Sequence, residues 1–550
     1  MATEYRNPTE IIVNHIISSA DIQKRNQALF AGDLLKTMDI TACISAERHA
    51  KLPCVTLMMD DLVVSKDLYK GQVVNVTAKL TRAFGSSMEV VVDVHLKDMF
   101  TDEDVQVCQA YFVFVALAKV GKAKLTHLDP VTYDERLEYA LAYERRRLRY
   151  AARNAAKAKS AKKNADSSTV ANFDAISPGE VTMKDTAVES TELVAPNDAN
   201  HHQTTFGGQI MAWLVSLCTI SATKLCKKSP TIVELDGVHF LAKSVVGDRL
   251  LFKAMVNKTF DDKTFEVGCR VESRSLEGNI AHINSAYITF ALLDEKKQPL
   301  DVPVVKATTA DELKRQGNAV IRRQNKIAKE KILGKTGPAL TVPWTQKASD
   351  MLAFHNVSAV KRMYHMSFTE IQKICDCEVS SHKQDHITCF KVETSIGKPA
   401  ADVFKAVQLE TRACWDIIIS QSKLAQKIDE DDNLYYVILA SSFDGDKSSS
   451  KPGDYVVMES FRPAVEKDVY VVAYRSVSLE SYPESDQYKR QADLSSGFVI
   501  SQSASDPNQS TLTFVFQVTN EAAALILPNI QKNIQFFSQR MQKLREYLKV

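Results

Sequence analysis

The sequence predicts an α+β protein in which two copies of one domain precede a third domain of a different pattern. Three observations predict this fold class. They are a repeat across the first 300 residues, one apolar helix followed by alternating strands in each copy, and a change to many short strands near residue 350. The chain has 550 residues, which at roughly 100–200 residues per domain leaves room for about three domains.

The repeat is visible as matching features at one constant offset. In each copy a glycine opens an apolar helical stretch, a second glycine precedes a strand-like run, and an alanine begins a strand with an aromatic second residue. The pairs are Gly32 and Gly208, Gly71 and Gly247, and Ala110 and Ala286, each 176 residues apart, with Glu89 and Glu266 one residue further apart. A repeat of this length indicates two copies of a domain rather than a solenoid of short units.

Each copy is predicted to contain one buried helix and a curved antiparallel sheet. The helices are expected at Asp33–Ala50 and Gln209–Cys226, and the second is apolar almost all round, as a helix inside a fold should be. Residues 74–80 and 90–96 alternate between inward apolar and outward side chains, which is typical of half-buried antiparallel strands. A sheet wrapped around one helix is the hotdog architecture.

A basic segment separates the two copies. Residues 145–163 contain nine basic residues and no acidic residue. A solvated helix and linker explains this composition, and so does a patch that meets the phosphates of a nucleotide-bearing substrate. Nuclear targeting or nucleic-acid binding is a third interpretation, and aromatic interleaving gives it no support.

The last third of the chain follows a different pattern. A charged helical segment at residues 311–331 comes first. Many short strands with alternating apolar and polar residues follow it, and then one long helix, Ala522–Leu548. This order predicts an α+β domain with its final helix laid over a curved sheet. The strands are expected at Cys389–Thr394, Tyr435–Ala440, Asp454–Phe461, Val469–Ser476, Gly497–Ser501 and Thr511–Val518.

Motifs in this last third resemble those of the START lipid-transfer domain. They are Arg412 with Trp415-Asp416, Gly453–Val456, Tyr474–Val477, and Leu527-Pro528 before the last helix. The resemblance covers roughly residues 353–550. It implies a helix-grip fold that holds one lipid in a cavity under its C-terminal helix.

The two repeats resemble the hotdog acyl-CoA thioesterases. The matching segments are Phe206–Trp213, Gly32–Leu35 with Met38-Asp39, and Phe84–Val90. Two hotdogs and a START domain in this order are similar to the cytosolic acyl-CoA thioesterases. The resemblance implies hydrolysis of acyl-CoA, from acetyl-CoA to longer chains, without a cofactor, in a homo-oligomer (a trimer or dimer) that adenine nucleotides regulate. The alternative function is a catalytically weak acyl-CoA or lipid sensor, or a lipid-transfer protein.

These observations together predict five segments. They are a hotdog domain at 10–135, a basic helical linker at 136–175, a second hotdog at 176–305, a linker at 306–350, and a START lipid-binding domain at 351–550.

Thioester hydrolysis needs a group that activates water and a donor that holds the developing oxyanion. Asp39 lies seven residues after Gly32, in an otherwise apolar helix where an unpaired carboxylate is costly. Seven residues after Gly208 comes Val215, so only one copy has an acid at this position. We therefore predict one working site with Asp39 as base or nucleophile. The alternative is an aspartate on an exposed helix face.

The start of the second helix supplies the predicted oxyanion donor. Backbone N–H groups there are unpaired and carry positive dipole character, and glycine lets a substrate approach closely. We expect the Gly208 N–H to hold the oxyanion, with Gly207 beside the substrate. The family motif has an Asn three residues before the glycine pair. Thr204 stands there, Asn200 is four residues out of register, and copy one has Ala28, so Thr204 is predicted to orient the water.

Two further segments are candidates for CoA binding. Ser86, Ser87 and Met88 are expected to line the pantetheine tunnel, and an ordinary strand and turn is the alternative. Arg322 and Arg323 are expected to meet nucleotide phosphates, and a solvated helical face is the alternative.

Bulk properties exclude several other classes. A net charge of +2 gives no general attraction to nucleic acid or to an anionic membrane. Ten cysteines without framework spacing, and a start without an apolar signal, favour a reducing compartment, the cytosol. No apolar run approaches the ~18–20 residues that span a bilayer. No standard zinc-finger spacing, P-loop or nucleophile elbow occurs, so we expect no metal.

Overall fold

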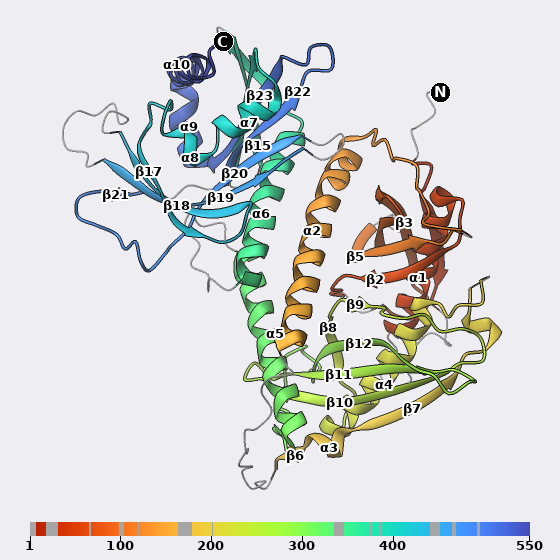
Figure 1. The fold of residues 1–550 in the computed structure, drawn as a ribbon. Coiled ribbons are helices and arrows are strands. Elements are labelled where there is room, and N and C mark those ends of the chain that lie inside the picture. The colour runs from red at the N-terminus through yellow and green to blue at the C-terminus, as the bar shows by residue number, and fades with distance from the viewer. Residues whose placement is uncertain are drawn as a thin grey trace. The chain divides into compact units, whose positions relative to one another are not determined.

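The chain forms two compact units in the computed structural model (Figure 1). Unit 1 contains residues 1–129 and 168–323, and unit 2 contains residues 130–167 and 324–550. The structure describes residues 7–17, 31–64, 68–97, 104–118, 120–162, 179–200, 202–334, 346–374, 376–384, 387–440, 452–464, 469–491 and 495–550. The predicted fold class is confirmed, because two hotdogs form unit 1 and a helix-grip sheet forms most of unit 2.

The first hotdog wraps an antiparallel sheet around one helix. Its elements are β1 (Ile11–Ile16), α1 (Ala31–Ala50), β2 (Cys54–Met59), β3 (Val73–Phe84), β4 (Ser87–Lys97) and β5 (Asp104–Ala116). The strand order is β1-β3-β4-β5-β2. Val92 of β4 pairs with Ala110 of β5, and both side chains are buried in the core that packs on α1. The period-two pattern therefore marks the strands correctly.

The second hotdog repeats this arrangement around α4. Its elements are β6 (Val181–Thr182), α3 (Met183–Thr186), β7 (Val188–Leu193), the 3-10 helix η1 (Pro196–Asp198), α4 (Gly207–Cys226), β8 (Thr231–Leu235), β9 (Val238–His239), β10 (Arg249–Thr259), β11 (Thr264–Arg274), β12 (Ile280–Ala291) and β13 (Val305–Lys306). Helix α5 (Ala310–Gly334) follows this hotdog, and its residues from Gln324 onward belong to unit 2. The main sheet has the order β7-β10-β11-β12-β8, and α4 lies against it (Figure 1).

The two hotdogs share their sheets and pack their central helices together. The short strand β9 of the second copy pairs with β2 of the first, with Met58 opposite His239 and Met59 opposite Val238. Helix α1 contacts α4, and one continuous apolar core includes side chains from both copies. This pairing brings the start of α4 to the middle of α1, which positions the candidate site.

Unit 2 is a long antiparallel sheet with helices against it (Figure 1). Its elements are α2 (Tyr133–Lys162), α6 (Gln346–His365), β14 (Thr369–Ile374), β15 (Cys377–Gln384), β16 (Ile387–Ile396), α7 (Ala400–Ala406), α8 (Leu409–Arg412), β17 (Ile419–Lys427), β18 (Asp432–Leu439), β19 (Gly453–Arg462), β20 (Tyr470–Ser476), β21 (Lys489–Arg490), β22 (Ser496–Gln502), β23 (Ser510–Thr519), α9 (Asn520–Ile526), η2 (Leu527–Asn529) and α10 (Ile530–Leu548). The order is β14-β15-β16-β23-β22-β20-β19-β18-β17, and β21 pairs with β19.

The predicted terminal helix is interrupted. Residues 520–548 form α9, the 3-10 turn η2 and α10 instead of one helix from residue 522 to residue 548. Pro528 lies in η2, and proline lacks the N–H that a continuous helix would need there. The apolar face of α10, which includes Phe537 and Met541, packs into the core of the sheet.

Helix α2 belongs to unit 2 although it lies between the two hotdogs in sequence. It runs beside α6 (Figure 1), and its Glu144 accepts hydrogen bonds from Lys361 Nζ at 3.3 Å and Arg462 Nε at 3.1 Å. Arg462 also pairs with Asp432 at 3.0 Å, and these four side chains are buried. Part of the predicted linker, residues 136–162, therefore belongs to unit 2.

The repeat extends beyond the hotdogs into the helices that follow them. Thr132 and Glu135 cap α2, because the Glu135 carboxylate accepts from two backbone N–H groups and the Thr132 hydroxyl accepts from the Glu135 N–H. Thr309 and Glu312 form the same capping box at the start of α5. Both residues of the second box lie 177 positions after their counterparts, so the duplicated segment included the helix.

Candidate functional site

The site is built where the first turn of α4 meets the middle of α1. Gly208 packs so closely there that a Cβ atom would lie 2.7 Å from the Lys36 Cα and 2.8 Å from the Asp39 Cβ. Both distances are shorter than real Cβ contacts, and one of the two atoms belongs to the backbone. Glycine is therefore required at this position for the helices to meet.

Asp39 is completely buried at this contact, with 0% of its surface exposed. The Gly208 N–H donates to Oδ2 at 2.7 Å, and the Thr56 hydroxyl donates to Oδ1 at 2.8 Å. Burial raises the pKa of Asp39 from its ordinary 3.8 to about 6, although the bonds from Gly208 and Thr56 act in the opposite direction. A carboxylate with this pKa accepts a proton readily near neutral pH.

A cavity of about 200 Å³ lies against this carboxylate, between the two hotdogs. Thr56 of β2 and Gly207 of α4 line it, whereas Asp39 itself does not. Asp39 therefore lies immediately behind Thr56 and the glycine pair. A molecule in the cavity would contact the carboxylate through the Thr56 hydroxyl.

Asn200 lines this cavity, and hydrogen bonds hold its carboxamide in one orientation. Its Oδ1 accepts from the His202 N–H at 3.0 Å, the Thr204 N–H at 3.1 Å and the Thr204 hydroxyl at 3.0 Å. These three donors identify the oxygen and leave the Nδ2 group without a partner among the residues the structure describes. The Nδ2 group is thus a donor available to a bound molecule.

Counting along the chain missed Asn200 because the loop before α4 folds back on itself. The Asn200 N–H donates to the Thr204 carbonyl at 2.9 Å, and Gln203 adopts a positive φ of 61°. Residues 200 and 204 are therefore neighbours in space. Thr204, the predicted water-orienting residue, instead donates its hydroxyl to Asn200. An Asn four residues before a Thr, in a turn, was the available sequence signal.

The Gly208 N–H, the predicted oxyanion donor, already donates a hydrogen bond within the protein. The Gly208 N–H donates to Asp39, whereas the Gly207 N–H lies in the first turn of α4, beside the cavity, and has no acceptor among the described residues. The first N–H groups of a helix have no intrahelical partner. Gly207 is thus the better-placed donor for a developing negative charge.

The pseudo-symmetric position in the second copy lacks an acid. Val215 is buried in the core of unit 1. Residues 26 and 28, which would contribute the opposite loop, lie outside the described residues. The symmetric position therefore has no carboxylate at residue 215.

Of the residues predicted to bind the substrate or CoA, Gly207 lines the cavity, whereas Ser86, Ser87, Met88, Arg322 and Arg323 do not. Met88 is buried in the core, and the Ser86 carbonyl accepts from the Ala116 N–H at 3.0 Å in an ordinary turn and strand. Arg322 donates to the buried Glu266 at 2.9 and 2.7 Å and lies 3.5 Å from the centre of the Tyr287 ring.

The two remaining candidates are engaged in local contacts. Ser87 begins β4, and its hydroxyl donates to the Phe84 carbonyl at 3.4 Å. Arg323 pairs with Asp262.

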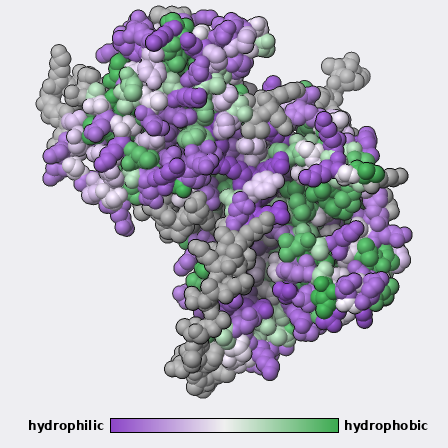
Figure 2. Space-filling model, in the orientation of Figure 1, coloured by the Kyte–Doolittle hydropathy of each residue, from purple (hydrophilic) through white to green (hydrophobic). Residues whose placement is uncertain are grey.

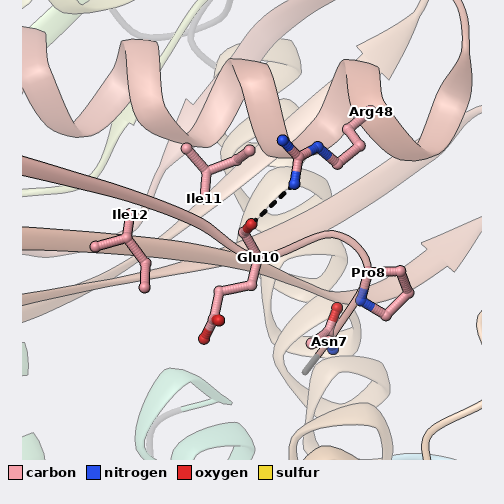
Figure 3. A pocket seen from close by; sticks show the side chains of 6 residues that line it. All are labelled: Asn7, Pro8, Glu10, Ile11, Ile12 and Arg48. Carbon is pink, nitrogen blue, oxygen red and sulfur yellow. Dashed lines mark hydrogen bonds between the residues drawn. The ribbon is translucent and has the colours of Figure 1, made fainter. Parts of the chain in front are cut away.

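A second hollow, of about 370 Å³, lies at the start of β1 (Figure 3). Arg48 Nη1 donates to the Glu10 backbone carbonyl at 3.1 Å, while the Glu10 carboxylate points away from the guanidinium (Figure 3). Ile11 and Ile12 complete its lining with Asn7 and Pro8.

Unit 2 contains a cluster of charges beneath α10. Arg412 donates to Asp416 at 2.7 Å, and Arg540 donates to both oxygens of the same carboxylate at 3.0 and 2.8 Å. Burial opposes ionisation of Asp416, but the two guanidinium groups outweigh it and hold the pKa below its ordinary value. Nearby, burial raises the pKa of Glu459 to about 8, against a bond from the Leu409 N–H. Two guanidinium groups therefore share one carboxylate in this cluster.

Within the described part of the chain, one helix is long and apolar enough to cross a membrane. It is α4, and 61% of its apolar stretch is buried inside unit 1. No unbroken apolar run appears in the sequence here, because polar residues such as Ser216 and Thr219 interrupt the stretch. The described residues include no group of three or more His, Cys, Asp or Glu side chains arranged to hold a metal ion.

Two family models match the chain. The START domain matches residues 362–523, and the thioesterase superfamily matches residues 202–277. The second match includes residues 202–206 of the loop that follows Asn200, together with Gly207 and the rest of α4.

Relatives match along nearly the whole chain. Acyl-coenzyme A thioesterase 11 of Mus musculus is 36% identical over 95% of this chain and 88% of its own length. Acetyl-coenzyme A thioesterase of Mus musculus is 36% identical over 98% of this chain and 95% of its own. A Staphylococcus aureus acyl-CoA hydrolase structure is 27% identical over 28% of this chain and 92% of that chain, with a TM-score of 0.26. With its tandem hotdogs and START domain, the chain belongs to the acyl-coenzyme A thioesterase family.

Proposed function

We propose that the chain hydrolyses acyl-CoA to the free acid and CoA at one composite site between its two hotdogs. The observation that carries this proposal is Asp39, a buried carboxylate with a pKa of about 6 that is held by Thr56 from one copy and Gly208 from the other. A base of this pKa is half ionised near pH 6 and almost fully ionised at pH 7.5.

The geometry favours Asp39 as a base rather than a nucleophile. A nucleophilic oxygen must contact the thioester carbon, and Asp39 does not line the cavity. The Thr56 hydroxyl does line it and donates to Asp39. Water in the cavity can pass a proton to the Thr56 oxygen while the Thr56 hydrogen moves to Asp39.

The remaining steps use groups on the loop and helix of the second copy. The hydroxide attacks the thioester carbonyl, and the Gly207 N–H and Asn200 Nδ2 donate to the oxyanion that forms. The C–S bond then breaks and the carbonyl re-forms. The proton held by Asp39 returns through Thr56 to the departing CoA thiolate. Water is thereby added across the C–S bond, and no other reactant is needed.

Release of free CoA thiol from acetyl-, butyryl- and palmitoyl-CoA tests this function. We expect Asp39→Asn to lower kcat/KM about 10²-fold or more, as removal of a general base does. Asp33→Asn is the matched control, because Asp33 is an exposed acid on the same helix. Equal activity of Asp39→Asn and wild type would exclude Asp39 as the base, and an inert wild type that still binds CoA esters would favour the sensor alternative.

We infer that the START domain binds one lipid with an anionic head. The support is the two guanidinium groups of Arg412 and Arg540 around a single Asp416 carboxylate, beneath the C-terminal helix. Native mass spectrometry after incubation with fatty-acid-containing vesicles should detect one bound lipid. Arg540→Met should lose it, and Lys543→Met, on the same helix but exposed, should keep it. Retention by Arg540→Met would contradict this assignment.

We also propose a cytosolic homo-oligomer, a dimer or trimer. Apolar residues gather over unit 1 on the face shown in Figure 2. In unit 1, Leu241, Leu276 and Ile280 are 67%, 78% and 64% exposed. Large exposed apolar patches mark association surfaces. Light scattering should give two or three times 61.3 kDa, and a mass of 61.3 kDa at micromolar concentration would refute self-association.

A further inference from the structure

Two cysteines line the cavity next to the candidate base. Cys43 follows Asp39 by four residues on α1, so it lies on the same helix face about 6 Å further along. Cys54 precedes Thr56 by two residues on β2, so both side chains point to the same side of the strand. The Cys43 sulfur lies 3.9 Å from the Cys54 carbonyl oxygen. The cavity therefore has a thiol layer one helical turn from the Asp39–Thr56 layer.

The two cysteines of the thiol layer line the cavity as apolar groups and do not act as nucleophiles. Both cysteines are buried. Burial raises the pKa of Cys54 to about 12, with the nearby Glu47 charge adding to it, and raises the pKa of Cys43 further. Protonated, buried thiols behave as small apolar groups. Ile210 and Phe240 add apolar surface to the same cavity.

The cavity is small compared with a long acyl chain. Its volume of about 200 Å³ is slightly larger than the roughly 150 Å³ of an apolar cavity that holds one benzene ring, so it has room for about six to eight non-hydrogen atoms. A butyryl thioester, counted as sulfur, carbonyl oxygen and four carbons, fits within that limit. A palmitoyl thioester exceeds it more than twofold.

We propose that Cys43 and Cys54 form the end wall of the acyl cavity and set the longest chain that the enzyme accepts, at about four carbons. This inference rests on the proposed function for the position of the thioester at Thr56 and Gly207. The acyl chain then runs from the carboxylate layer into the thiol layer. The exposed residues of the lining, Leu57, Leu241 and Lys243, would then face the CoA moiety.

The test compares chain-length profiles. For wild type, kcat/KM should be highest for acetyl- to butyryl-CoA and at least tenfold lower for hexanoyl-CoA. Cys43→Leu should lower the ratio of butyryl-CoA to acetyl-CoA activity tenfold or more. The double variant Cys43→Ala/Cys54→Ala should raise the hexanoyl-to-acetyl ratio. Cys108→Ala is the matched control, because Cys108 is a buried thiol of the same hotdog outside the cavity.

Binding of 2-oxoalkyl-CoA thioethers, which cannot be hydrolysed, separates the two proposals. Calorimetry with two-, four- and six-carbon thioethers should reproduce the same cut-off, and Cys43→Leu should shorten it even if the wild type proves inert towards thioesters. If the cysteine variants weaken all chain lengths and free CoA equally, the pantetheine arm occupies the thiol layer and the inference is overturned. An unchanged profile in both variants would also overturn it.

Discussion

Asp39→Asn should make the protein more stable and less active at the same time. On folding, the pKa of Asp39 rises from 3.8 to about 6. At 1.36 kcal/mol per pH unit, this difference corresponds to about 3 kcal/mol of free energy of unfolding. Because the folded pKa is the higher one, this stability is fully present below pH 3.8 and is lost as the pH rises through about 6.

Asparagine has the shape of the aspartate but no charge to bury. It should therefore raise the free energy of unfolding of unit 1 by up to about 3 kcal/mol at pH 7.5, and by almost nothing at pH 4. Urea unfolding followed by the fluorescence of Trp213, with the other two tryptophans replaced by phenylalanine, measures this in unit 1. In the same pH series, kcat/KM of the wild type should rise through an apparent pKa near 6 and level off above pH 7.

A particular result would refute this reasoning. If Asp39→Asn destabilises unit 1 by the same amount at pH 4 and pH 7.5, the carboxylate carries no burial penalty. A pH-rate profile without a step between pH 5 and 7 would likewise show that Asp39 is not the titrating base.

Three other substitutions test separate parts of the structure. Thr204→Val should lower kcat roughly tenfold with little change in KM, because it removes one hydrogen bond that orients Asn200. Thr204→Ser keeps the hydroxyl and should restore kcat. A change confined to thermal stability would exclude the positioning role of Thr204. Gly208→Ala should destabilise unit 1 by about 3 kcal/mol through the contacts that its Cβ would make, whereas Gly317→Ala, at a helix site with open space, should be neutral or stabilising in the same urea experiment. Glu144→Gln should cost unit 2 about 3–5 kcal/mol, because Lys361 loses its buried counter-ion and Arg462 keeps only Asp432. An unchanged urea midpoint would contradict this.

Periodicity predicts the fold well because the repeat constrains two copies at once. Both central helices begin within two residues of their predicted starts, at Ala31 and Gly207, since apolar periodicity is strongest in long buried helices. The break at Pro528 can be predicted from the missing N–H of proline. The place of α2 in unit 2 cannot be predicted from the sequence pattern, because its partners Lys361 and Arg462 lie hundreds of residues away.

The candidate site was predictable only where the contact follows from helix geometry. Asp39 is identified by the cost of a carboxylate in an apolar helix, and its environment in the structure agrees with that cost. Asn200 was missed because a turn, rather than linear spacing, brings it beside Thr204. The pairing of Arg322 with Glu266 could not be predicted, since a helix pattern alone does not reveal a partner on a distant strand.

The discontinuous path of the chain has a consequence for synthesis on the ribosome. Glu144 emerges 217 residues before Lys361 and 318 residues before Arg462. At about 5–20 residues per second, α2 leaves the ribosome roughly 16–60 s before the strand that neutralises it. Unit 1 can meanwhile be completed at residue 323, so the hotdogs have time to assemble first. The third domain, by contrast, must pack against a helix that was made tens of seconds earlier.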